Sequence, residues 1–206
     1  MDRRQFFRRG FSKIANVVLT AAEEQALRKA RSWMRPPFAV GELELLSKCT
    51  RCDACIEACP HQVIFPLSQV QGGTAAGTPA LDLVNKGCHL CSDWPCLTAC
   101  ETGALDNPDV VDEADTIAED SAPNLSLTPE RRLSDVSIDI DQCLPYLGPE
   151  CGACMGSCPV NALNWQGPKP NIDETLCVGC ALCREACITE PKSINIAKCA
   201  YATETT

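Results

Sequence analysis

The sequence predicts an α+β protein built from two small modules of short strands and helices, and three observations lead to this expectation. Seventeen of the 206 residues are cysteine. The cysteines recur at short, regular spacings along the chain, which predicts repeated small units rather than one large core. Ordinary apolar residues are scarce once the cysteines are set aside, so something besides hydrophobic burial is expected to hold the modules together.

The chain is expected to begin with a basic amphipathic arm over residues 1–40. Residues 1–35 hold nine Lys and Arg against three acids, whereas the rest of the chain is acidic and the net charge is −9. Five apolar residues recur at steps of four and three, as on one face of a helix: Phe7, Phe11, Ile14, Val18 and Ala21. Such a helix packs on the body, docks a partner protein or contacts an anionic membrane surface. The acidic balance argues against nucleic-acid binding.

The first residues are similar to a twin-arginine export signal, with Arg3 and Arg4 ahead of Phe6 and Phe7. Lys13 interrupts the apolar region that should follow, and no small-residue cleavage site comes after it. No stretch approaches eighteen apolar residues, so no spanning helix is expected. We therefore expect a cytoplasmic protein, in which clustered cysteines are more typical of metal sites than of disulfides.

Sixteen of the cysteines form four groups of four with two- to seven-residue gaps. The groups are Cys49, Cys52, Cys55, Cys59; Cys88, Cys91, Cys96, Cys100; Cys143, Cys151, Cys154, Cys158; and Cys177, Cys180, Cys183, Cys187. The first and fourth groups have the spacing of bacterial ferredoxins, whose fourth cysteine ligates the other of two clusters. The second and third groups are stretched variants. We predict four [4Fe-4S] clusters, with all sixteen cysteines as iron ligands.

Other uses of these cysteines fit the pattern less well. Zinc motifs usually divide their ligands into two distant pairs. Cysteines two residues apart bridge poorly as disulfides. A three-iron cluster at one stretched group stays open as an alternative. Cys199 is left over, and we expect it to be a partly buried thiol because no partner remains for it.

The gaps between groups favour pairing the first group with the second and the third with the fourth. Eighteen residues separate Cys158 from Cys177, and 28 separate Cys59 from Cys88. The longer gap holds a loop-like insertion, Ser68–Thr78. The ligand sets would then cross within each pair, with Cys100 joining the first three cysteines of the first group. The rival is a nested pairing, first with fourth and second with third.

This pairing predicts a module over 41–110, an acidic linker over 111–134, a second module over 135–200 and a tail over 201–206. The linker is expected to be a solvated connector or a docking surface for a basic redox partner. Strands are expected at Val136–Asp141, at Leu81–Val84, in a hairpin from Ala162 to Asp173 and at Ser193–Ile196. Short helices are expected after the fourth cysteines, as at Pro159–Ala162.

Several apolar residues next to the cysteines are expected to pack around the clusters: Ile56, Val63, Ile64, Leu105 and Val178. The chain has only two histidines, His61 and His89, each beside a cysteine loop. We expect both to lie near the clusters or in solvent rather than to act in acid–base catalysis. No catalytic residue is therefore predicted.

The layout resembles the NapF-type ferredoxin proteins of periplasmic nitrate reductase systems. The features that carry the resemblance are Arg3-Arg4 without a usable signal, Arg35-Pro36-Pro37, the run from Cys49 to Cys59, and the third group with Tyr146 inside it. The likeness extends over most of residues 1–198. The second group, which includes Trp94-Pro95-Cys96, is more similar to the NapG and MauM-type relatives.

The resemblance implies a cytoplasmic four-cluster protein that acts with a molybdenum-dependent nitrate reductase. It implies electron delivery, with maturation of the catalytic subunit as an alternative role. The residues themselves indicate a one-electron carrier rather than an enzyme. A third alternative is a permanent iron–sulfur subunit of a larger oxidoreductase. The partner would be contacted through the N-terminal arm or the acidic linker.

Overall fold

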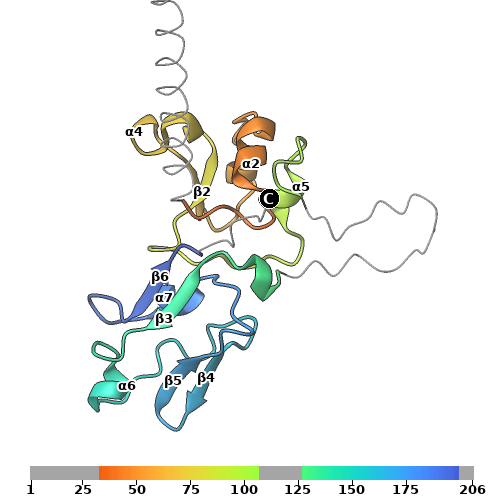
Figure 1. Ribbon diagram of the computed structural model, residues 1–206. Coiled ribbons are helices and arrows are strands. Elements are labelled where there is room, and N and C mark those ends of the chain that lie inside the picture. Colours follow the sequence, from red (N-terminus) through yellow and green to blue (C-terminus); the bar gives the residue numbers. More distant parts are fainter. Residues whose placement is uncertain (1–32, 107–126, 200–206) are drawn as a thin grey trace, which may run out of the picture.

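The computed structural model describes residues 33–106 and 127–199, and it is a small mixed structure of short helices and strands (Figure 1). The predicted α+β class is confirmed. The predicted helix of the N-terminal arm, residues 111–126 of the predicted acidic linker and the predicted tail over 201–206 lie outside the described residues.

The C-terminal half, residues 127–199, contains two antiparallel strand pairs. Strand β3 (Asp135–Ile138) pairs with β6 (Ile194–Ala197), and β4 (Leu163–Gln166) forms a hairpin with β5 (Lys169–Ile172). The predicted hairpin and terminal strand are therefore found. The helical elements of this half are η2 (Pro129–Arg131), α6 (Leu144–Leu147) and α7 (Leu182–Ala186).

The N-terminal half, residues 33–106, follows a similar order of elements. Strand β1 (Ile64–Pro66) pairs with β2 (Pro79–Leu81). Where the C-terminal half has the pair β3 and β6, this half has a single bridge between Ala39 and Leu105. Beside the bridge, the Asp106 N–H donates to the Phe38 carbonyl at 2.8 Å. The main helices are α2 (Glu42–Lys48), α3 (Ala54–Glu57) and α5 (Pro95–Thr98).

Two local predictions are wrong. The strand expected at Leu81–Val84 lies earlier, at Pro79–Leu81, because Asp82 turns the chain by accepting N–H bonds from Asn85 and Lys86. The helices lie before the fourth cysteines rather than after them. After the fourth cysteine the chain reverses through a left-handed residue, at Gln62 and again at Asn161, each with φ of 53°. Such a residue cannot continue a right-handed helix.

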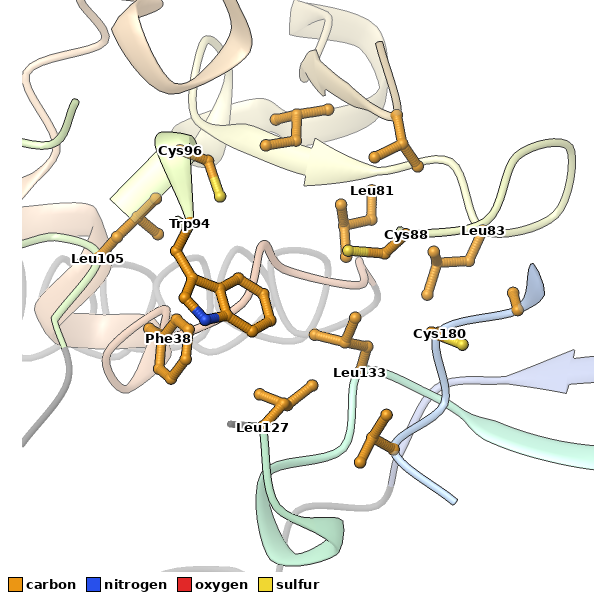
Figure 2. Packing of buried hydrophobic residues seen from close by; sticks show 14 residues of the cluster. Phe38, Leu81, Leu83, Cys88, Trp94, Cys96, Leu105, Leu127, Leu133 and Cys180 are labelled. Carbon is orange, nitrogen blue, oxygen red and sulfur yellow. The ribbon is translucent and has the colours of Figure 1, made fainter. Parts of the chain in front are cut away.

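One hydrophobic core is shared by the two halves. Phe38 and Trp94 meet edge-on with ring centroids 4.8 Å apart, and Leu127 and Leu133 pack into the same cluster (Figure 2). Of the five residues expected to surround the clusters, Ile56 packs against this core. The other four are buried in it: Val63, Ile64, Leu105 and Val178. The core therefore joins residues from both sides of the acidic linker.

The insertion between β1 and β2 is folded back on the first cysteine group. It contains α4 (Gln69–Gly72), which Ser68 caps, and η1 (Gly73–Ala75). The Arg51 guanidinium donates to the carbonyls of Ala76 at 2.8 Å and Thr74 at 3.2 Å. These bonds hold the insertion beside the loop that carries Cys49 and Cys52.

Arg35 anchors the start of the described chain to the base of this insertion. Its guanidinium is buried, pairs with Glu42, and donates to the Thr78 hydroxyl at 3.0 Å and to the Pro79 carbonyl at 2.7 Å. Thr78 is itself fully buried. One arginine therefore binds a part-buried carboxylate, a buried hydroxyl and the carbonyl of the first residue of β2.

We expect Arg35→Met to destabilise the protein by about 3–5 kcal/mol, because it leaves the largely buried Glu42 carboxylate and the buried Thr78 hydroxyl without their partner. Thermal melting followed by far-UV circular dichroism measures this. The matched control is Lys48→Met, which breaks the exposed Lys48–Glu44 pair and should leave the melting temperature almost unchanged. Equal melting of the two variants would contradict the anchoring role.

Candidate iron–sulfur sites

The structure gathers the sixteen grouped cysteines into four sets of four. Set A is Cys49, Cys52, Cys55 and Cys100; set B is Cys59, Cys88, Cys91 and Cys96; set C is Cys143, Cys151, Cys154 and Cys187; set D is Cys158, Cys177, Cys180 and Cys183. Each set takes three cysteines from one group and the last cysteine of a neighbouring group. These are the crossed sets of the sequential pairing; that they ligate iron is part of the proposal below.

Three of the sets line cavities of similar size. The empty space at each, with the open solvent at its mouth included, is about 370 Å³ at set A, about 350 Å³ at set C and about 320 Å³ at set D. Their walls are largely apolar, with Leu105 at set A, Ile194 at set C and Val178 at set D. Each cavity thus offers four sulfur ligands within a largely apolar lining.

Burial and crowding of the thiols show that each set is a close assembly. Burial, followed by the charges of Cys100 and Cys49, raises the pKa of Cys55 to about 12. Burial and the neighbouring Cys59 raise the pKa of Cys96 to about 11, which links Cys59 to the second group. Thiolates this close repel one another, so a positively charged centre is needed to hold all four ionised.

The same crowding is present in the C-terminal half. Burial, followed by the charges of Cys180 and Cys177, raises the pKa of Cys183 to about 12, and Cys158 acts in the same direction. Burial is also the main cause that raises the pKa of Cys154, ahead of the neighbouring charge of Cys187.

The cysteine loops are wound through left-handed residues. Arg51, Leu90 and Gly179 each precede the second cysteine of a group, with φ between 49° and 69°. At Gly179 a side chain is excluded, since a Cβ would lie 2.1 Å from the Ser134 carbonyl oxygen. This winding lets one short loop direct several sulfurs toward a common centre.

The residues present fit an iron–sulfur cluster. In residues 33–106 and 127–199, no three His, Cys, Asp or Glu side chains converge closely enough for a single metal ion, whereas a cluster is bound by four thiolates spread around it. All seventeen cysteines, which lie within those ranges, are free of disulfide bonds. Trp165, which lines the cavity of set C, has a buried indole N–H without a partner in the structure, so a donor is available there.

Hydroxyl groups adjoin the fourth cysteine at set C. The Thr189 and Ser193 oxygens lie 3.2 and 3.4 Å from the Cys187 sulfur. The Ser193 N–H donates to the Thr189 oxygen at 2.8 Å, which leaves the Thr189 proton free for the sulfur. Burial raises the pKa of Cys187, but the hydrogen bonds from Ser193 and Thr189 outweigh it and bring the pKa to about 7.

We expect Thr189→Val to lower the reduction potential of a centre at set C, because hydrogen bonds to the sulfurs stabilise the more negative reduced state. The shift should be on the order of tens of millivolts, since about 59 mV corresponds to a tenfold change for one electron. A redox titration followed by EPR measures it. Thr175→Val is the control, because that hydroxyl bonds only to Asp173; a similar shift in both variants would contradict this role.

Some features near the sites were not expected from the sequence. His61 and His89 stack face to face, with ring centroids 3.5 Å apart and planes inclined by 5°, and they connect the loops of Cys59 and Cys88. The sequence does contain a pattern that indicates hydroxyl groups near the cysteine sulfurs. Cys100 and Cys187 are each followed two residues later by threonine. The Thr102 oxygen lies 3.7 Å from the Cys100 sulfur.

Cys199 lies apart from the four sets. It is buried, and its thiol donates to the Arg132 carbonyl at 3.4 Å. Burial raises its pKa to about 11. This agrees with the expected partly buried thiol.

Cysteine sets of this kind on short strands and helices are those of a ferredoxin-type iron–sulfur protein. A family model described as a 4Fe-4S dicluster domain matches residues 48–104, which span the first two cysteine groups. The chain is 30% identical over 167 residues to the ferredoxin-type protein NapF of Escherichia coli, covering 78% of this chain and 83% of that protein. The chain therefore belongs to the ferredoxin-type family that includes NapF, NapG and MauM.

Other relatives cover more of this chain. It is 31% identical over 194 residues to the ferredoxin-type protein NapG of Haemophilus influenzae, covering 87% of this chain and 64% of that protein. It is 29% identical over 201 residues to the methylamine utilization ferredoxin-type protein MauM of Methylorubrum extorquens, covering 91% of this chain and 82% of that protein. No solved structure matches the chain. In the part of the chain that the structure describes, no helix is long and apolar enough to cross a membrane.

Proposed function

We propose that this protein is an electron carrier that binds four [4Fe-4S] clusters, one at each of sets A, B, C and D, in two ferredoxin-like modules. The observation that carries the proposal is the convergence of sixteen thiols into four sets of four. Each cluster supplies a centre that gains and loses single electrons when bound. The match of a dicluster domain to residues 48–104 supports two centres in the N-terminal module.

The chain's own residues hold and shield these centres. Short helices place two cysteines about one turn apart, each for a different set, as with Cys55 in α3 and Cys59 just after it. The insertion, tethered by Arg51, stands beside set A, and hydroxyls adjoin set C. No proton-transfer group is required for this function.

Reduction by a one-electron donor tests the proposal. Anaerobically purified protein treated with dithionite should lose visible absorbance reversibly and give EPR signals of reduced [4Fe-4S] clusters. Four electrons per chain are expected at full reduction, about one for each cluster. An absence of reversible bleaching in protein that contains iron and sulfide would overturn the electron-transfer function.

We propose a redox partner protein contacted through the N-terminal arm or the acidic linker. The partner implied by the resemblance is a molybdenum oxidoreductase such as the catalytic subunit of nitrate reductase. The named role of MauM in methylamine utilization shows that this family is not restricted to one system. The proposed location is the cytoplasm, as the sequence leads us to expect.

A maturation role is the second candidate, and the charge of the arm favours it. Residues 1–35 carry a net +6 on an otherwise acidic chain. Removal of residues 1–32 tests this role and leaves the buried Arg35 anchor in place. Loss of partner-enzyme maturation with unchanged cluster reduction would support a maturation factor, whereas unchanged maturation would remove that role from the arm.

A further inference from the structure

We infer that the four cysteine sets lie in the order A, B, D, C along the molecule, with sets B and D as neighbours at a fixed junction between the two halves. This inference rests on the proposed function, since it concerns the route between the sites. Nothing in the spacing of the cysteines gives this order.

Within each half, short helices make two sets neighbours. Helix α3 carries Cys55 of set A and leads to Cys59 of set B. Helix α5 carries Cys96 of set B and leads to Cys100 of set A. Two segments therefore connect the same two sets, which places A beside B.

The C-terminal half repeats this connection. Helix α7 carries Cys183 of set D and leads to Cys187 of set C. Cys154 of set C is followed by Cys158 of set D after one turn. Set D is therefore beside set C. To complete the order, one must know which set of the N-terminal half lies next to which set of the C-terminal half.

The contact between the halves lies at one cysteine of set B and one of set D. The Cys88 N–H donates to the Cys180 carbonyl at 2.7 Å, and both residues are buried in the shared core (Figure 2). Cys180 lines the cavity of set D, whereas none of the described residues that line the cavities of sets A and C makes a hydrogen bond across this contact. Sets A and C are thus the outer pair.

Several further contacts fix this junction. The Gly87 N–H donates to a Glu185 carboxylate oxygen at 2.7 Å, and the Arg184 guanidinium donates to the Val84 carbonyl at 2.8 Å. At Gly87 a Cβ would lie 2.7–2.8 Å from Leu182, including its backbone. Glycine is therefore required for the segment to approach α7 this closely.

The junction makes the passage between the halves a transfer between sets B and D. One electron leaves one of these sites and reduces the other, with no bond or proton changed. The outer sets A and C are then the sites at which an external donor and an external acceptor exchange electrons. A single relay, rather than two independent ferredoxin modules, follows from this order.

EPR of matched variants tests the order. Cys183→Ala removes a ligand of set D and Cys154→Ala removes a ligand of set C, and both are third cysteines of their groups. In the dithionite-reduced full-length protein, the loss of set D should abolish the spin–spin broadening that the C-terminal half imposes on the N-terminal signals. The loss of set C should leave that broadening in place. The reverse result, or equal effects, would overturn the order.

Gly87→Ala tests the junction without removing a ligand. It should weaken the same broadening while iron and sulfide stay at the wild-type level, because the added methyl group pushes the segment away from α7. Gly152→Ala is the control, since its Cβ meets only the end of Met155 at 3.9 Å. If Gly87→Ala does not fold, Glu185→Gln supplies a milder change with the same expected direction. Full broadening in a folded junction variant would contradict the inference, whereas missing iron and sulfide in the wild type would refute the proposed function instead.

Discussion

Removal of iron and sulfide should abolish the cooperative unfolding transition of this protein. The described strands form only two-stranded pairs, which have little stability alone. Cysteines of the proposed ligand sets also occupy the core, among them Cys88, Cys96 and Cys180. Without metal these buried thiols have no centre to bind, so folding should be coupled to cluster binding. Thermal melting by circular dichroism, before and after treatment with a chelator under reducing conditions, measures the effect.

Cys199→Ala is the matched control for this experiment. Cys199 is buried but lies outside the four sets, so its loss should leave the iron content and the cooperative melting of the loaded protein in place. An apo-protein that melts cooperatively, near the temperature of the loaded protein, would contradict the coupling of folding to the clusters.

Two double variants should lose different amounts of iron if the ligand sets cross between groups. Cys59→Ala with Cys88→Ala changes two groups but only set B, so about four iron atoms should be lost, the content of one cluster. Cys52→Ala with Cys59→Ala changes one group but both sets A and B, so about eight should be lost. Iron and sulfide analysis of the two purified proteins gives the answer.

The comparison is independent of the general cost of removing two cysteines, because both variants remove the same number. If each ligand set were confined to a single group, the iron losses would be reversed. The variant that changes Cys59 and Cys88 would then lose more iron than the variant that changes Cys52 and Cys59. That outcome would contradict the crossed sets.

The sequence indicated the local parts of this structure well. The spacing of the cysteines depends on which sulfurs one loop can direct inward, and this local geometry is readable from the gaps. The hairpin from Ala162 to Asp173 was readable for the same reason, since its strands are separated by a turn of Gly and Pro. The helices were misplaced because Gln62 carries no signal of its left-handed conformation, and the left-handed preference of asparagine at Asn161 was outweighed by the expected helix.

Contacts between distant residues could not be predicted. Gly87 and Glu185 are 98 residues apart in sequence, and no periodic pattern relates them. In the sequence Arg35 stood out only as part of the Arg35-Pro36-Pro37 run, yet it is a buried anchor for Thr78 and Pro79. Such contacts depend on how the halves pack, and one sequence gives no measure of that packing.

The iron and sulfide content of anaerobically purified protein, combined with EPR of the reduced state, tests the central claim most directly. Four [4Fe-4S] clusters predict about sixteen iron and about sixteen acid-labile sulfide per chain, with signals from interacting reduced clusters. About half that content, or stoichiometric zinc without sulfide, would contradict the assignment of the sixteen cysteines to four clusters.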